Sequence, residues 1–253
     1  MALYRYVKKN VTLKYKIVAY LSYGLILIGS LFLFWSFYPV VSYEIYSYLF
    51  IQNKFFSPIP ETTQSLAHLK AQSILKNQNI FSTNLVDYTK ATSWFPTLED
   101  SKSDPTKLFT TKEYTLSIPK LNITDGKVLV GAEDLSEAMV QYQPRVLPGE
   151  YGVVSIFGHS THPSLYATSG NGKYKSIFTY LPTLDKGDTI FITVNGKEYT
   201  YEVFDKFEVK PDEVGVLDQR YDNAYLNIIT CVPVGQIARR LIVQAKLTEL
   251  NHN

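Results

Sequence analysis

A long uncharged run near the N-terminus is the feature that most limits how this chain can fold. No charged residue occurs between Ile17 and Tyr43. A membrane-spanning helix needs about 20 apolar residues, and Pro39 indicates an end near Tyr38. We therefore predict a transmembrane helix over residues 17–38. A cleaved signal peptide is the alternative, but its apolar region is shorter, about 7–15 residues, and a small-residue cleavage site follows it. No pair of small residues stands at a suitable distance here.

The charges before this run predict the orientation of the chain in a cell membrane. Basic residues without any acidic residue precede the run: Arg5, Lys8, Lys9, Lys14 and Lys16. Positively charged flanks stay on the cytoplasmic side. We predict a basic cytoplasmic tail over residues 1–16, a single membrane pass, and an extracytoplasmic remainder. Residues 39–112 are predicted as an interfacial segment in contact with lipid, then a stalk with a short helix over residues 61–76.

From residue 113 to residue 250 the pattern changes to short strands separated by turns. Asn195-Gly196, between two strand-like runs, is a strong hairpin signal. The expected strands are residues 114–118, 127–130, 152–157, 189–194, 197–209, 225–230 and 240–247, with short helices at 136–140 and 177–181. About eight short strands favour a mostly β fold, a closed or nearly closed β-barrel.

Composition excludes several classes of function. The net charge is +2 and the basic residues form no patch, which argues against a nucleic-acid partner. A single cysteine cannot form an intramolecular disulfide bond. Acidic residues in predicted loops are interpreted as solvated surface, so no metal or cofactor is expected: Glu133, Asp134, Glu137, Asp212 and Glu213.

The single cysteine, Cys231, is predicted to end the strand over residues 225–230. A lone cysteine is usually a small buried hydrophobe. An unpaired thiol outside the cell is exposed to oxidation, however, so its presence there needs a reason. Nucleophilic catalysis by a thiolate requires an acid/base partner and a group that stabilises an oxyanion. His159 follows the predicted strand 152–157 and is the better-placed histidine, whereas His162 lies in a polar loop.

Arginine suits the third role because its guanidinium stays charged and presents several donors. Arg239 and Arg240 stand next to each other at the start of the last predicted strand. Side chains alternate faces along a strand. Only one of the two arginines can therefore face Cys231, and the alternation does not say which.

These residues resemble those of the sortases, membrane-anchored cysteine transpeptidases of bacterial surfaces. Asn227-Ile228-Ile229-Thr230-Cys231 is similar to the family's Thr-Leu-x-Thr-Cys strand end, with Asn227 and Ile228 in place of Thr-Leu. The resemblance extends over roughly Tyr114 to Leu247 and includes these motifs: Cys231-x-Pro233-x-Gly235, Arg240-Leu241-Ile242-Val243, Leu147-Pro148-Gly149, Gly158-His159-Ser160, Ile118-Pro119-Lys120-Leu121 and Gly187-Asp188-Thr189-Ile190. Some relatives carry an Asp-Pro-aromatic lid before the first strand, but here Thr106 follows Asp104-Pro105.

The resemblance implies a sortase-like catalytic domain over residues 113–250. It implies Cys231 as the nucleophile, His159 as the acid/base, and Arg240, not Arg239, as the group that positions substrate and oxyanion. The implied reaction cleaves a C-terminal sorting signal of a surface protein through a thioester. The acyl group then passes to an amine acceptor, such as a peptidoglycan precursor or a pilin lysine.

Alternative functions remain open at this point. An L,D-transpeptidase also joins cysteine and histidine on β-structure, but its nucleophile resembles Ser-x-Gly-Cys-x-Arg, which Thr230-Cys231-Val232-Pro233 lacks. A non-catalytic anchored adhesion or assembly module would hold Cys231 as a buried core residue. Hydrolysis in place of transfer, as in a cysteine protease, is a further possibility.

Overall fold

The computed structural model describes residues 13–51, 88–95, 109–165 and 170–251. The chain divides into two compact units, Met1–Phe50 and Ile51–Asn253. The helix predicted over residues 61–76 lies outside the described residues.

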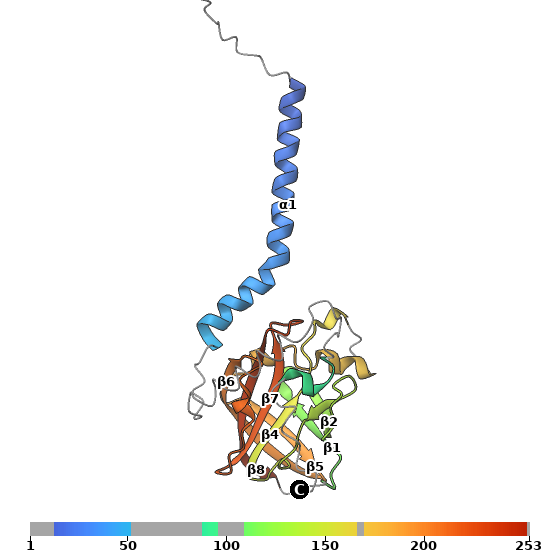
Figure 1. Cartoon of the computed structure of the whole chain (residues 1–253), viewed down its shortest axis with the longest axis vertical. Coiled ribbons are helices and arrows are strands. Elements are labelled where there is room, and N and C mark those ends of the chain that lie inside the picture. Colours follow the sequence, from blue (N-terminus) through green and yellow to red (C-terminus); the bar gives the residue numbers. More distant parts are fainter. Residues whose placement is uncertain (1–12, 52–87, 96–108, 166–169, 252–253) are drawn as a thin grey trace, which may run out of the picture. The chain divides into compact units, whose positions relative to one another are not determined.

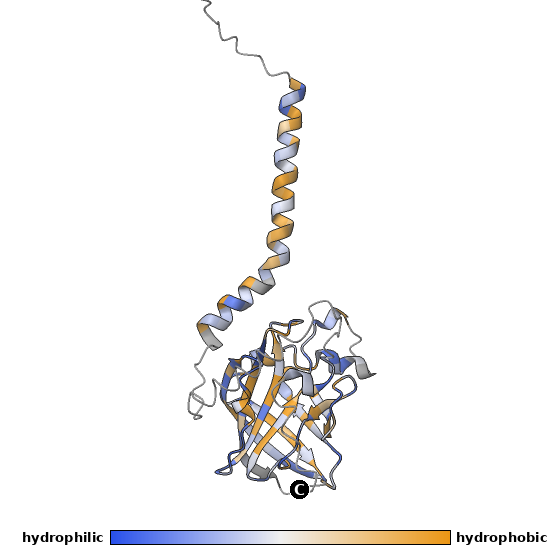
Figure 2. Cartoon of the chain, viewed as in Figure 1, coloured by the Kyte–Doolittle hydropathy of each residue, from blue (hydrophilic) through white to orange (hydrophobic). Residues whose placement is uncertain are grey.

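The first unit contains the long helix α1 (Leu13–Tyr46), followed by the π-helical turn η1 (Ser47–Ile51). By length and composition, Leu13–Tyr38 could cross a membrane, and Figure 2 shows this stretch as mainly hydrophobic. The hydroxyls of Ser22 and Ser30 each donate to a backbone carbonyl four residues earlier, at 2.9 Å. Such bonds satisfy the serine hydroxyls within the helix itself.

The candidate span ends at Tyr38, where the sequence places its end, and the helix itself continues past Pro39 to Tyr46. Proline removes one backbone donor and commonly bends a helix without ending it. Figure 1 shows α1 changing direction along its length.

The second unit is a closed barrel of eight strands (Figure 1). The strands are β1 (Glu113–Ile118), β2 (Ile123–Val130), β3 (Met139–Gln141), β4 (Gly152–Phe157), β5 (Thr189–Val194), β6 (Lys197–Val209), β7 (Ala224–Val232) and β8 (Arg239–Asn251). Their order around the barrel is β1-β2-β3-β4-β7-β8-β6-β5, and β5 closes it by pairing with β1. Pairs β2–β3 and β4–β7 are parallel and the others antiparallel. The predicted barrel is confirmed.

The β5–β6 hairpin turns at Asn195 and Gly196, which have φ angles of 50° and 78°. Two positive φ angles in a two-residue loop match the twist of the flanking strands. The strands on either side are fully paired up to Val194 and Lys197. The dipeptide therefore fixes the register of this hairpin, as its sequence predicts.

Within residues 88–95, 109–165 and 170–251, helical structure is limited to short 3-10 turns. They are η2 (Ala91–Trp94), η4 (Pro119–Leu121), η5 (Pro163–Leu165), η6 (Gly170–Ser176), η7 (Leu181–Thr183) and η8 (Val214–Leu217). The helix predicted over residues 136–140 is wrong, because Met139–Gln141 forms strand β3. This short strand lies between β2 and β4 and is held by both. Residues 177–180 form a turn between η6 and η7.

Strand β7 is buried on both faces along almost its whole length. Alternation places Ile228 and Thr230 on one face, and Ile229 and Cys231 on the other. The face with Cys231 joins a buried hydrophobic cluster that includes Trp94, Phe95 and Phe157. Cys231 is therefore packed in the same cluster as Trp94 and Phe95, which lie well before β1 in the sequence.

Candidate active site

Cys231 and Arg240 lie opposite each other on neighbouring antiparallel strands. Cys231 is the penultimate residue of β7, and its register partner is Arg240, the second residue of β8. Directly opposite residues project from the same face of a sheet, with Cβ atoms about 5 Å apart. Cys231 is 7% exposed and Arg240 1% exposed. The register therefore brings a thiol and a guanidinium together in a buried setting.

Three backbone carbonyls hold the Arg240 guanidinium. Nε donates to the carbonyl of Trp94 at 3.1 Å, and Nη1 donates to the carbonyls of Ile237 at 2.9 Å and Arg239 at 3.1 Å. The guanidinium carbon also lies 5.6 Å from the centroid of the Trp94 ring. Burial lowers the pKa of Arg240, while interactions with Cys231 and Tyr88 oppose that change.

Arg239 belongs to a different environment. Its Nη1 forms an ion pair with the Glu208 carboxylate of β6 at 3.0 Å, and that carboxylate is only 2% exposed. Alternation along β8 turns Arg239 away from the face that Arg240 shares with Cys231. The strand register thus separates the two arginines, which the sequence pattern alone could not do.

His159 lies just beyond β4, which pairs in parallel with β7. The pairing ends at Phe157 and Ile229, so residues 159 and 231 each follow the last pair by two positions. The His159 ring centroid is 5.7 Å from that of Trp94. The backbone N–H of Phe178 donates to the His159 carbonyl at 2.9 Å. Cys231, Arg240 and His159 consequently gather around one tryptophan.

Residues 88–95, which we call the covering segment, close this site. Ala91, Trp94 and Phe95 are fully buried. The Ala91 N–H donates to the Glu133 carbonyl and the Leu135 N–H to the Thr89 carbonyl, both at 2.8 Å. These bonds attach the segment to the loop before β3. It falls within the range predicted as a stalk, yet it packs on the barrel.

Aromatic contacts fix Trp94 within the cover. The Trp94 ring packs edge-on against the Phe157 ring with centroids 5.8 Å apart. The Phe95 ring also packs edge-on against Phe157, at 6.1 Å between centroids. Trp94 Nε1 donates to the Tyr88 carbonyl at 2.9 Å, so the indole has a polar partner although it is buried. The segment excludes water from the thiol.

This burial changes the acidity of the thiol. It raises the pKa of Cys231 to about 11, although the positive charge of Arg240 acts in the opposite direction. A thiolate is the reactive form of cysteine. In the covered arrangement, therefore, the thiol is held mainly neutral near pH 7.

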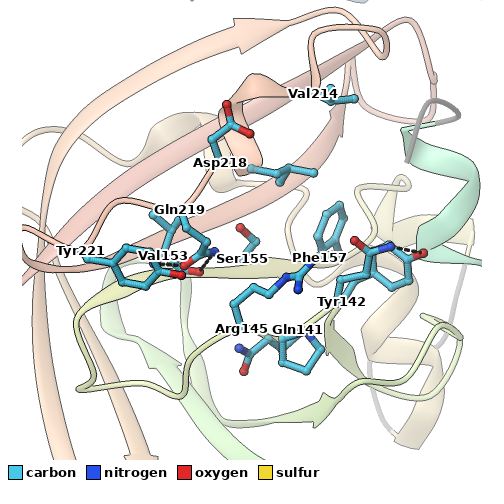
Figure 3. A pocket seen from close by; sticks show the side chains of 13 residues that line it. Gln141, Tyr142, Arg145, Val153, Ser155, Phe157, Val214, Asp218, Gln219 and Tyr221 are labelled. Atoms are coloured by element: carbon cyan, nitrogen blue, oxygen red, sulfur yellow. Dashed lines mark hydrogen bonds between the residues drawn. The ribbon is translucent and has the colours of Figure 1, made fainter. Parts of the chain in front are cut away.

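A pocket of about 330 Å³ lies beside the covered site (Figure 3). Phe157 belongs both to the pocket wall and to the cluster around Cys231. Ser155 of β4, Arg145 of the β3–β4 connection and Asp218 after η8 also line it, as Figure 3 shows. The pocket combines an aromatic wall with charged side chains of both signs.

A family model described as "Sortase domain" matches residues 116–248. The chain belongs to the sortase family. Members of this family are cysteine transpeptidases, and the matched region spans the barrel from β1 to β8.

Individual sortases show moderate similarity to this chain. Sortase D of Bacillus subtilis is 26% identical over 138 residues, which is 52% of this chain and 61% of the relative. Sortase A of Bacillus anthracis is 33% identical over 84 residues, 32% of this chain and 40% of the relative. The chain thus spans less than two thirds of the length of these curated relatives. A solved sortase D5 from Clostridium perfringens is 27% identical, with a TM-score of 0.46, covering 55% of this chain and 79% of that one.

Most of the predicted site residues meet in the sortase barrel. Cys231, Arg240 and His159 surround Trp94, whereas His162 is exposed and its Nδ1 lies 2.7 Å from the Ser164 hydroxyl. Asp104-Pro105-Thr106 lies outside the described residues. Among the residues that the structure describes, no group of three or more acidic, cysteine or histidine side chains could hold a metal ion.

Sequence reasoning missed the covering segment of this sortase. One signal was present, because Trp94-Phe95 places two large aromatic residues in an otherwise polar stretch. Large aromatics contribute strongly to buried clusters. Their position on the barrel could not be predicted, since it depends on contacts with Phe157 and Arg240, far along the chain.

Replacing Trp94 with alanine should expose the sortase thiol to reagents. If the pKa of Cys231 returns from about 11 to its ordinary value of 9.0, the thiolate fraction at pH 8 rises roughly 100-fold. The rate of alkylation by iodoacetamide, followed by mass spectrometry between pH 6 and pH 10, measures this change. Because the same substitution removes a buried ring and costs about 3–5 kcal/mol of stability, unfolding midpoints must be recorded in parallel.

Trp94→Phe is the matched control, because it keeps an aromatic ring against Phe157. Its alkylation rate should stay within a few-fold of the unmodified chain. Equal alkylation rates for Trp94→Ala and the unmodified chain, with both folded, would show that the segment does not control access to the thiol.

Proposed function

We propose that this chain is a sorting-signal transpeptidase in which Cys231, His159 and Arg240 perform the chemistry. One observation carries the proposal: Cys231 ends β7 directly opposite the buried Arg240. Membership of the sortase family and the place of His159 at the same edge of the sheet support it. The family supports the reaction class, and this geometry supports the residue roles.

The first half of the reaction forms a thioester. The Cys231 thiolate attacks the carbonyl carbon of the substrate peptide bond, and the carbonyl electrons move to the oxygen. The Arg240 guanidinium and nearby backbone N–H groups stabilise this oxyanion. As the C–N bond breaks, protonated His159 gives its proton to the leaving amine.

The second half transfers the acyl group. An incoming amine attacks the thioester carbonyl, neutral His159 takes one proton from that amine, and the C–S bond breaks. The product is a new peptide bond, and the thiolate–imidazolium pair is restored. Water in place of the amine would give a carboxylic acid, which is hydrolysis.

Access to Cys231 requires the covering segment to move. Trp94 occupies the face on which a substrate carbonyl would have to meet Arg240, and its own carbonyl already accepts a bond from Nε. Displacing the covering segment would remove the burial that raises the pKa of Cys231 and leave the favourable charge of Arg240. We propose that the neighbouring pocket, which shares Phe157 with the site, then holds part of the bound peptide.

The apolar helix supports a membrane-anchored arrangement. We propose that α1 spans the cell membrane once with the basic N-terminus in the cytoplasm, so that the barrel faces outward. Substrates would then be surface proteins with a C-terminal sorting signal. The acceptor would be an amine of a cell-wall precursor or of another protein subunit.

Product analysis tests this function with the full-length chain in detergent micelles. A panel of sorting-signal peptides is incubated with and without an amine acceptor such as triglycine, and the products are identified by mass. We expect an amide-linked conjugate that requires both the peptide and the acceptor. A carboxylic acid alone in the presence of amine would indicate a hydrolase, and no product from any peptide would favour a non-catalytic module.

A further inference from the structure

Ser160 links the loop that carries His159 to strand β7, which carries Cys231. It is a buried polar residue, 4% exposed, directly after His159. Its hydroxyl donates to the backbone carbonyl of Cys231. Its own carbonyl accepts a bond from the Gly235 N–H at 2.8 Å. Ser160 is therefore hydrogen-bonded to both ends of the turn that follows the cysteine, at Cys231 and at Gly235.

The hydroxyl takes the place of a backbone group in the β4–β7 ladder. Parallel strands are joined by evenly spaced backbone hydrogen bonds. At the end of the ladder Phe157 pairs with Ile229, and the N–H of the next residue, Gly158, donates to the Ile229 carbonyl at 3.2 Å. Two residues further on, the same pattern would join the Ser160 N–H to the Cys231 carbonyl. The Ser160 side chain makes that connection instead.

This substitution has a geometric consequence. The β4 backbone can leave the sheet after Gly158, which lets His159 lie against Trp94, while the Cys231 carbonyl keeps its partner. Thr230 Oγ1 donates to the Gly158 carbonyl at 2.7 Å, just before the bend. The two hydroxyls thus bracket His159 and connect it to the strand that carries the nucleophile.

We propose that Ser160 is a positioning residue that sets His159 relative to Cys231 by bonding the Cys231 carbonyl through its hydroxyl and Gly235 through its own carbonyl. The inference rests on the proposed function. Ser160 does not touch the reacting atoms and acts only through its bonds to the Cys231 carbonyl and the Gly235 N–H. A displacement of about 1 Å between catalytic groups can lower a rate about 100-fold.

Ser160→Ala, Ser160→Thr and Ser164→Ala test this role in the full-length chain. Ser160→Ala should lower kcat for peptide transfer about 100-fold and leave KM within about twofold, because Ser160 does not line the pocket proposed to hold the peptide. Ser160→Thr restores a hydroxyl and should recover most of kcat. Ser164→Ala, the same change at an exposed position four residues later, should behave like the unmodified chain.

The pH dependence separates positioning from a general loss of structure. The profile of kcat/KM reports the ionisations of the essential acid and base, and Ser160→Ala should displace both limbs, which loss of folded protein alone would not do. A kcat for Ser160→Ala within threefold of the unmodified chain, or one reduced only in proportion to the folded fraction, would overturn the proposal.

A second measurement distinguishes failure of this inference from failure of the proposed function. Alkylation of Cys231 against pH needs no substrate, and it is measured in the Trp94→Ala background, where the covering ring is absent. Coupling to His159 should appear there as an inflection that adding Ser160→Ala removes and adding Ser164→Ala keeps. If no peptide is transferred but this difference is seen, the function fails and the positioning role stands. Coincident alkylation profiles, or no inflection in the folded Trp94→Ala parent, would overturn the positioning role whether or not transfer occurs.

Discussion

Replacing Cys231 with alanine should lower the rate of peptide transfer by at least about 10⁴-fold, because no other thiol exists in the chain to form the thioester. The measurement is conjugate formation by the full-length chain with a peptide that the unmodified chain transfers. Cysteine and alanine are close in size, so the buried cluster around Trp94 and Phe157 should remain packed.

Cys231→Ser provides the control for this prediction. It keeps the shape of the nucleophile but replaces the thiol with a far less acidic hydroxyl, so it should also fail to transfer. Thermal unfolding of both variants should stay close to that of the unmodified chain. Transfer by a well-folded Cys231→Ala variant at more than a hundredth of the normal rate would show that another group is the nucleophile.

Replacing Arg240 with lysine should lower kcat/KM about 10²–10³-fold, the usual effect of removing an oxyanion donor. The guanidinium presents Nε and Nη1 in a fixed plane to three carbonyls, whereas a lysine ammonium is a compact charge with different geometry. Carbonyls left without donors should also cost about 1–3 kcal/mol of stability. Steady-state kinetics and urea unfolding measure the two effects.

Arg239→Lys is the matched control, one residue away on the opposite face of β8. It keeps a positive charge for the Glu208 ion pair and should change kcat/KM less than threefold. Equal losses for the two lysine variants would contradict a specific role for Arg240. A stability loss in Arg240→Lys with unchanged kcat/KM would assign that residue to folding alone.

Local sequence signals predicted most of the barrel because the strands carry strong short-range patterns. The ends of β4, β5 and β6 match the predicted ranges, and Asn195-Gly196 supplies both positive φ angles of its turn. Strand β3 was not predicted. It has three residues and is stabilised by neighbours on both sides, so its conformation comes from tertiary pairing.

The site was predictable to the extent that strand position determines it. The end of β7 and the alternation along β8 limited the partners of Cys231 to one arginine of an adjacent pair. Choosing Arg240 required either a family resemblance or the strand register that the structure provides. The Trp94 cover and the Ser160 bond join residues distant in sequence, and no local pattern encodes such contacts.

Mass spectrometry of the protein after brief incubation with a sorting-signal peptide tests the central claim most directly. The acyl-enzyme is trapped by acid quenching in the absence of an amine acceptor, and the modified residue is located by peptide mapping. We predict a mass increase equal to the N-terminal fragment of the peptide less one water, located on Cys231, released by hydroxylamine and absent from Cys231→Ala. Transfer without any adduct on Cys231, or an adduct on another residue, would contradict this account.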